Sequence, residues 1–339
     1  MAVIELTGVA GAIAPRRRRG RSVAAKLGGG LAVLVPIVVL SSFITYCLGA
    51  LSNSNPAATI LGQDAATPAA VAKLDRALGL DKPLVVQYWD WLTQAVQGHL
   101  GVSYFTQIPV SQSIGQRLPV DLSIALLAVV LAVLIGGTAG TVAAVNRGSW
   151  FDRGVTIACS VVSTLPAFVV GIILVVLFAV SAHLLPASGY TAPSAGVGPW
   201  LEHIILPSLA LALQVAADIA RQLRTSLVSV LDQNYIVGAR VRGLPYRRVL
   251  VRHALRNACG PALTILGNDF PIMLAGAVAA EVVFSLPGLG QLLLAAAEER
   301  DIPVVQGVLL VVATFVIVVN LVVNTLLAAL NRSADGVSA

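Results

Sequence analysis

Few side chains in this 339-residue chain have the type and spacing that chemistry requires. Its only lysines are Lys26, Lys73 and Lys82, and none completes the Gly-x-x-x-x-Gly-Lys-Ser/Thr loop that cradles nucleotide phosphates. There is no Gly-x-Ser-x-Gly elbow and no His-Glu-x-x-His motif. The sequence therefore predicts no catalytic residue, no metal site and no cofactor in this chain. A membrane-embedded hydrolase is a weaker alternative.

One carboxylate is unusual because it lies within a long apolar run, ILGNDFPIML. Ionisable groups in such a run are costly and usually face a cavity or a partner. Helical spacing places Met273, Gly276 and Phe284 on roughly the same face as Asp269. We predict that these four residues line a pathway through the protein, with Asp269 placed to meet a cationic group. The alternative is that Asp269 makes a helix–helix hydrogen bond or is hydrated near the membrane surface.

The elements that position these residues are transmembrane helices. The chain is 57% hydrophobic and only 11% charged, with a mean hydropathy of +0.87, whereas soluble domains are roughly one quarter charged. Apolar runs long enough to cross a bilayer recur along the sequence. We predict an all-α integral membrane protein with six spans: 31–51, 119–145, 154–182, 203–226, 260–284 and 304–330.

The basic residues set the predicted orientation. If the N-terminus is inside, 17 of the 22 Lys and Arg residues lie on the inner side, as the positive-inside rule requires. This gives a cytoplasmic tail at 1–30 and another at 331–339. Because the basic residues fall between apolar runs, the net charge of +6 indicates membrane topology and not nucleic-acid binding.

An extracytoplasmic lobe is predicted at 52–118. Thr67-Pro68 is typical of a helix start and Gly79 of its end. A second amphipathic helix follows, with an apolar stripe: Leu84, Tyr88, Trp91, Leu92 and Ala95. Two interpretations remain open for this lobe. It lies on the bilayer with Trp89 and Trp91 as belt residues, or it forms a docking surface for a soluble partner.

A long cytoplasmic loop, 227–259, separates spans four and five. Tyr235 to Arg242 can form a short helix, and Gly243 is well placed to end it. The segment is basic on one side and apolar on the other. It either lies on the membrane and binds anionic headgroups, or inserts into a groove of a cytoplasmic partner.

This loop contains GARVRGLPYRRVLVRHALRNACGP, which resembles the coupling segment of ABC-importer permeases, most closely the peptide and nickel group. Gly238, Ala239 and Gly243 match the alanine-rich helix and fixed glycine of that segment. Further similar runs occur in the same order: GLDKPLVVQYWDWL, RGSWFDR, STLPAF, LPASG and GAVAAEVVFSLPGLGQLLLAAAEERDIPVVQG.

The resemblance implies a type I ABC-importer permease that forms half of a heterodimeric pore for short peptides by alternating access. Its implied partners are a second homologous permease, two cytoplasmic ATPases that bind ATP and Mg, an extracytoplasmic solute-binding protein and the lipid bilayer. Nickel, glutathione, haem or another solute is the alternative cargo. A more distant alternative is that the chain is a proton-coupled secondary transporter. The implied ATPase-coupling residues are Tyr235, Gly238, Ala239, Arg240, Gly243 and Leu244.

Four other acidic residues near the predicted spans are given structural roles. We expect Glu281 to brace its helix against the SLPGLG turn and Asp218 to pair with Arg221 one turn later. Asp121 is expected to cap the start of span two. Asp152 is expected to belong to the short inner loop between spans two and three.

Overall fold

The computed structural model describes residues 36, 38–49 and 56–335, and these are almost entirely helical. The only β-pairing within them is an isolated bridge between Val102 and Pro109. The all-α prediction is therefore confirmed. The described helices are a first helix Val38–Gly49, α2 Pro56–Ala65, α3 Pro68–Leu78, α4 Leu84–Val96, α5 Val110–Val145, α6 Trp150–Thr164, α7 Ala167–Leu174, a π-helix Val175–Ser181, a 3-10 helix Pro193–Ala195, α8 Val197–Leu231, α9 Asn234–Val241, α10 Tyr246–Arg248, a π-helix Val249–Leu255, α11 Arg256–Phe284, α12 Leu289–Glu299 and α13 Ile302–Asp335.

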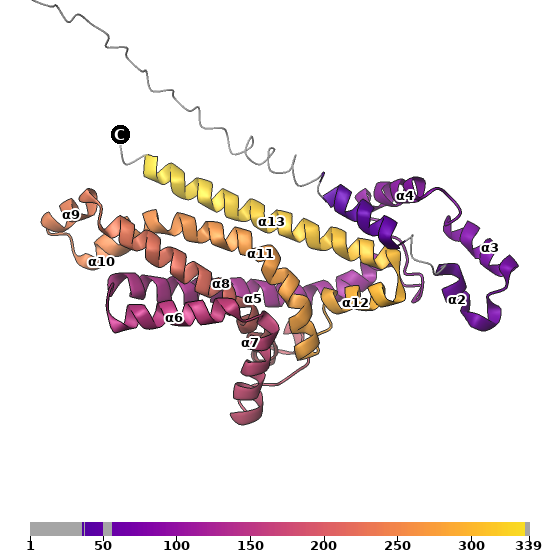
Figure 1. Cartoon of the computed structure of the whole chain (residues 1–339), viewed down its shortest axis with the longest axis horizontal. Coiled ribbons are helices and arrows are strands. Elements are labelled where there is room, and N and C mark those ends of the chain that lie inside the picture. The colour runs from indigo at the N-terminus through magenta and orange to yellow at the C-terminus, as the bar shows by residue number, and fades with distance from the viewer. Residues whose placement is uncertain (1–35, 37, 50–55, 336–339) are drawn as a thin grey trace, which may run out of the picture.

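The centre of the bundle is α8, which packs on α5 and α11 (Figure 1). Glycines on α5 allow a very close approach between the two backbones. A Cβ added to Gly136 would lie 2.5 Å from the carbonyl oxygen of Ala216, and one added to Gly140 would lie 2.6 Å from that of Ala220. Small residues in this spacing let membrane helices pack backbone to backbone. The α5–α8 pair is therefore tightly fixed.

In the part of the chain that the structure describes, four helical stretches are long and apolar enough to cross a membrane: α5, α8, Tyr246–Phe284 and Ile302–Thr325. The predicted third span, 154–182, is not one straight helix. It is divided between α6 and α7, whose axes differ by 109°. The break falls at Leu165, which is extended and precedes Pro166, because a residue before proline disfavours the α conformation. Counted as one bent span, this pair is the fifth.

The first predicted span, 31–51, lies only partly within the described residues. Residues 38–49 are helical and apolar, so the count of six stays a prediction. The tail 1–30 and residues 336–339 lie outside the described ranges. The second span starts at Val110 and not at 119, with Pro119 inside the helix, which moves the predicted boundary between lobe and core.

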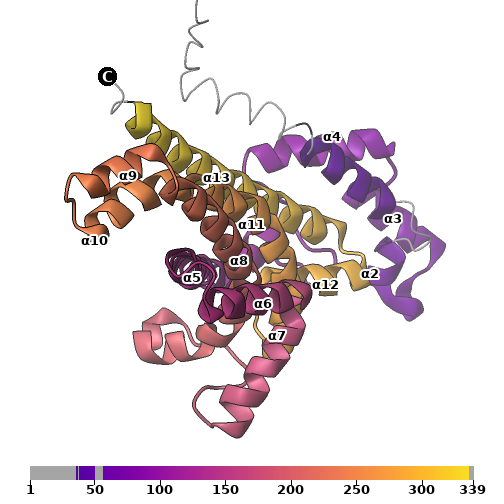
Figure 2. The same cartoon turned by 60° about the vertical axis from the view of Figure 1, so that its left-hand side comes forward.

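The lobe and the predicted coupling loop lie at opposite ends of the molecule. Figures 1 and 2 show α2, α3 and α4 at one end and α9 and α10 at the other. The side chain of Thr67 caps α3, and Gly79 ends it in the left-handed conformation, as predicted. We call these two ends the lobe end and the α9 end.

Candidate functional site

The α9 end is built around a short helix that leaves the bundle directly after α8. α9 ends where Gly243 adopts a φ of 78°. There the amide of Gly243 donates to the carbonyl of Arg240 at 2.9 Å, and the amide of Leu244 donates to that of Ala239 at 3.3 Å. A left-handed glycine with such bonds satisfies the last carbonyls of a helix. The predicted helix ended by Gly243 is confirmed.

One face of α9 packs on the bundle and the other is presented outward. Ile236 and Ala239 are buried in the main core, whereas Tyr235 and Arg240 are exposed. Ala239 therefore packs within this chain, and its implied coupling role stays a prediction. Val241 has 83% of its surface exposed and was not predicted, because an apolar residue in an amphipathic pattern is normally assigned to the packed face.

The exposed face is connected to the following helix. The Tyr235 hydroxyl accepts a hydrogen bond from the Asn257 amide at 2.8 Å, and the Arg240 guanidinium lies 5.5 Å from the centre of the Tyr246 ring. Six arginines on this segment are exposed: Arg240, Arg242, Arg247, Arg248, Arg252 and Arg256. Within the described residues, the ion pairs involve other arginines. The α9 end thus presents a cationic surface that complements an anionic one.

Two ion pairs at the α9 end connect α8 with the segments beside it. The Asp152 carboxylate is buried and accepts hydrogen bonds from Arg224 Nε and Nη2, both at 2.7 Å. It also accepts from the Gly148 amide at 3.0 Å. Arg147 and Asp232, just beyond α5 and α8, form a second, exposed pair at 3.0 Å. The sequence placed Asp152 in the short loop, but its partner could not be read from local spacing.

The predicted pathway residues do not share one environment. Met273 and Phe284 are buried in the main core, and the ring of Phe284 packs against Gly171. Gly276 faces Leu211. These contacts favour packing over an open path for Met273 and Phe284. Asp269 is half-buried, and its Oδ2 has no hydrogen-bond partner among the described residues. Of the four predicted pathway residues, Asp269 is the one with a side-chain oxygen that makes no hydrogen bond within the described residues.

Three further acidic residues that were predicted to have structural roles each hold a helix in place. Glu281 accepts from the amides of Gly290 and Gln291 at 3.1 and 2.8 Å, so its predicted bracing role is confirmed. The Asp121 prediction was wrong, because α5 already begins at Val110. Asp121 instead accepts from the Leu289 amide at 2.8 Å and so caps α12. The predicted pairing of Asp218 with Arg221 is confirmed.

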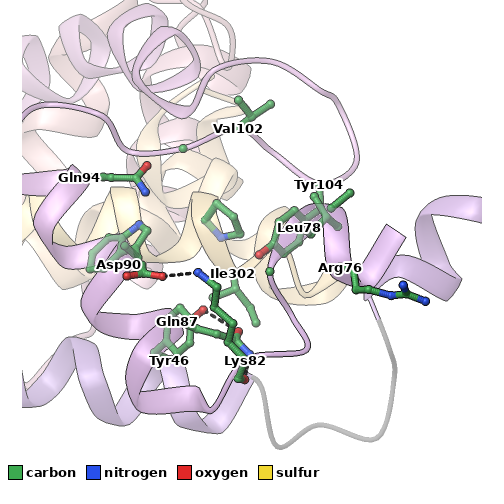
Figure 3. A pocket seen from close by; sticks show the side chains of 15 residues that line it. Tyr46, Arg76, Leu78, Lys82, Gln87, Asp90, Gln94, Val102, Tyr104 and Ile302 are labelled. Atoms are coloured by element: carbon green, nitrogen blue, oxygen red, sulfur yellow. Dashed lines mark hydrogen bonds and ion pairs between the residues drawn. The ribbon is translucent and has the colours of Figure 1, made fainter. Parts of the chain in front are cut away.

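At the lobe end, a pocket of about 470 Å³ lies between α3, α4 and the start of α13 (Figure 3). Polar side chains of α4 point into it, and Asp90 forms an ion pair with Lys82 at 2.7 Å. The hydrogen bond from Lys82 to Asp90 raises the pKa of the lysine above its usual value. The described residues thus contain two polar regions at opposite ends of an apolar bundle.

Comparison with known proteins identifies this architecture. Residues 132–336 match the family model for the binding-protein-dependent transport system inner membrane component, and residues 29–125 match the model for its N-terminal part. The chain belongs to this family. It is an integral protein of the bacterial inner membrane and a component of a binding-protein-dependent transport system.

Relatives of this transport component match along most of their length. A probable peptide ABC transporter permease of Sinorhizobium fredii is 36% identical, over 86% of this chain and 92% of its own. A putative peptide transport system permease of Brucella abortus is 39% identical, over 87% and 94%. A glutathione transport system permease of Escherichia coli is 39% identical, over 88% and 94%. The resemblance to ABC-importer permeases is confirmed.

Proposed function

We propose that this transport component forms half of the membrane pathway of an ATP-driven importer for short peptides. The observation that supports this most strongly is α9. It is a short helix presented at one end of the bundle, with Tyr235 and Val241 exposed beside a cationic surface. Such a protrusion fits a groove of another protein better than it fits the interior of this one.

In this proposal the chain has no catalytic role of its own. ATP and Mg are bound by two cytoplasmic ATPases, and α9 transmits their closure to the helices. The contact residues are the exposed and half-buried ones, Tyr235, Gly238, Arg240, Gly243 and Leu244, with Val241 added from its exposure. Ala239 contributes by fixing the helix to the bundle. The two permeases then alternate between inward- and outward-facing states as rigid bodies.

The orientation of the proposal follows from charge. Among the described residues, most of the Lys and Arg side chains lie toward the α9 end, which is assigned to the cytoplasm. The lobe end is then extracytoplasmic, where it meets a solute-binding protein. Both termini are cytoplasmic in this arrangement. A second, homologous permease completes the pathway, because one chain of this size provides only half of it.

Peptides are the proposed cargo because two relatives bear that description over most of this chain. Glutathione is the second candidate, supported by the relative from Escherichia coli. It is itself a small peptide, so both cargoes present an amino group and carboxylates. Nickel and haem present no amino group and are weaker alternatives.

Reconstitution tests the proposal. The chain is co-expressed with its genomic neighbours that encode a permease, ATPases and a binding protein, purified by a tag on this chain, and inserted into liposomes. We expect co-purification of ATPases and uptake of labelled peptides that requires ATP and the binding protein. A competition series with glutathione separates the two cargoes. Uptake that persists with hydrolysis-deficient ATPases and stops when a proton gradient is removed would instead identify a proton-driven carrier.

A further inference from the structure

Helix α4 in the lobe has three distinct faces. One is buried against the rest of the chain through Tyr88 and Ala95. A second is apolar and exposed, with exposed fractions of 64% for Val85, 63% for Trp89 and 81% for Val96. At 100° per residue these three side chains lie within one narrow stripe beside the buried face. A helix that is apolar on both a packed and an exposed face needs a second partner to cover the exposed one.

The third face of α4 is polar and lines the lobe pocket. Gln87, Asp90 and Gln94 point toward this pocket, as Figure 3 shows. Asp90 binds Lys82 there, and the Gln87 amide donates to the Lys82 carbonyl at 2.7 Å. The polar groups of α4 are therefore directed to one side, and the exposed stripe of Val85, Trp89 and Val96 faces away from this side.

The contacts of the buried face give the depth of α4 relative to the membrane helices. The Tyr88 hydroxyl lies 2.9 Å from the Val39 carbonyl and 2.7 Å from the Ser42 hydroxyl, both on the first helix. The Ser42 carbonyl in turn accepts from the Gln306 side chain at 2.9 Å. Gln306 lies about one turn, or ~6 Å, inside the start of α13 at Ile302.

Through Tyr88, α4 therefore packs on the candidate first span at the same height as the first turn of α13. It does not lie beyond the end of that helix. This depth is close to the 5–10 Å to which interfacial amphipathic helices bury their apolar face. The first helix also has an exposed apolar stripe of its own, Leu40, Ile44 and Leu48. Exposed apolar side chains on a candidate span are typical of contact with lipid, and the first helix is the element on which α4 packs through Tyr88.

We propose that α4 is an interfacial helix whose Val85, Trp89 and Val96 side chains lie in the outer leaflet of the bilayer, while its polar face borders the water-filled lobe pocket. From the sequence alone, an interfacial helix and a protein-docking surface predicted the same residues of α4. The structure distinguishes the packed residues from the exposed ones: Tyr88 and Ala95 pack inward, and Trp89 points outward. An indole at the interface is favourable, since its ring is apolar and its N–H is wet.

Spin labels on α4 test this proposal in the assembled transporter in liposomes. Cys47, Cys159 and Cys259 are replaced by serine, and single cysteines are introduced by Val85→Cys or Val96→Cys and labelled before assembly. Gln94→Cys is the matched control, because Gln94 is exposed on the opposite, polar face of the same helix. Collision with oxygen reports lipid, and collision with a water-soluble nickel chelate reports water.

We expect the ratio of oxygen to nickel accessibility to be several-fold higher at positions 85 and 96 than at 94, with or without the binding protein. Equal, water-like ratios at all three positions would overturn the proposal. So would labels at 85 and 96 that are water-accessible alone and become shielded when the binding protein is added, because the stripe would then be a docking surface. The readout needs only an inserted chain, so it holds whether or not the complex transports peptides.

Discussion

Asp152 on α6 and Arg224 on α8 form a two-fold hydrogen-bonded ion pair, with Nε–Oδ1 and Nη2–Oδ2 distances of 2.7 Å. This geometry is the strongest that a guanidinium and a carboxylate can adopt. Because α8 also packs closely on α5 at Gly136 and Gly140, α8 holds both α5 and α6 along the stretch that leads to α9. In the proposed mechanism, a movement of α9 would therefore reach these three helices together.

The first prediction concerns this pair. Asp152→Asn should lower the free energy of unfolding by about 3 kcal/mol, the lower end for breaking a buried pair, since Arg224 is one-third exposed. Arg147→Gln is the matched control, because the Arg147–Asp232 pair is exposed on both sides and such pairs are worth about 0–1 kcal/mol. Thermal unfolding of the purified chain in detergent measures both. Equal losses for the two variants would contradict a special role for Asp152.

The second prediction concerns the close approach of α5 and α8. Gly140→Ala should destabilise the chain by about 1–3 kcal/mol, because the added methyl would meet the Ala220 carbonyl and force the helices apart. Gly137→Ala is the control, since a Cβ there has no neighbour within 4 Å and alanine favours helix. The melting temperature of Gly137→Ala should equal or exceed that of the parent protein. The melting temperature of Gly140→Ala should lie below that of the parent. A reversed order would rule out the close contact.

The third prediction concerns the end of α9. Gly243→Val should uncouple ATP hydrolysis from uptake, because a φ of 78° is strained for a β-branched residue even though space is available. A strain of one to two kcal/mol would reduce the competent conformation by roughly 5–30-fold. Uptake and ATP hydrolysis are measured together in proteoliposomes.

Gly260→Ala is the control for this variant. Gly260 lies inside α11, outside the proposed contact residues and without a positive φ, and a Cβ there meets nothing within 4 Å. This variant should keep the parent ratio of uptake to hydrolysis. If Gly243→Val also keeps that ratio, the end of α9 has no part in coupling.

The sequence was sufficient for features that depend on neighbours along the chain. The helix before Gly243 and the Thr67 cap of α3 follow from local signals, and both are present. It was insufficient for features that depend on distant contacts. Which face of α9 packs inward is decided by the helices beneath it, so the burial of Ala239 could not be read from the sequence. The partner of Asp152 lies 72 positions away and has no local signal.

Two further differences have physical causes that hydropathy cannot report. The run 154–182 is apolar throughout, so it was predicted as one span although Leu165-Pro166 bends it by 109°. The four-residue pathway stripe assumed that one helix face has one environment. In the folded chain, however, Met273 and Phe284 are enclosed by other helices, whereas Asp269 keeps an unpartnered oxygen.

The last prediction concerns that oxygen. Asp269→Asn should reduce uptake of peptides with a free amino terminus or cationic side chains several-fold, and leave N-acetylated neutral peptides less affected, because the amide has the same size but no charge to attract an ammonium group. The Oδ2 atom has no partner among the described residues, so this oxygen loses no hydrogen bond on substitution. Initial uptake rates are compared at a saturating concentration of the same binding protein.

The exposed neighbour provides the control for this experiment. Asn268→Ala alters the adjacent polar side chain on the exposed face of α11 and should change no peptide's rate selectively. Because cargo is first selected by the binding protein, the informative quantity is the ratio of rates for charged and neutral peptides, not either rate alone. An unchanged ratio in Asp269→Asn would assign Asp269 to helix packing and remove the last member of the predicted pathway stripe from solute contact.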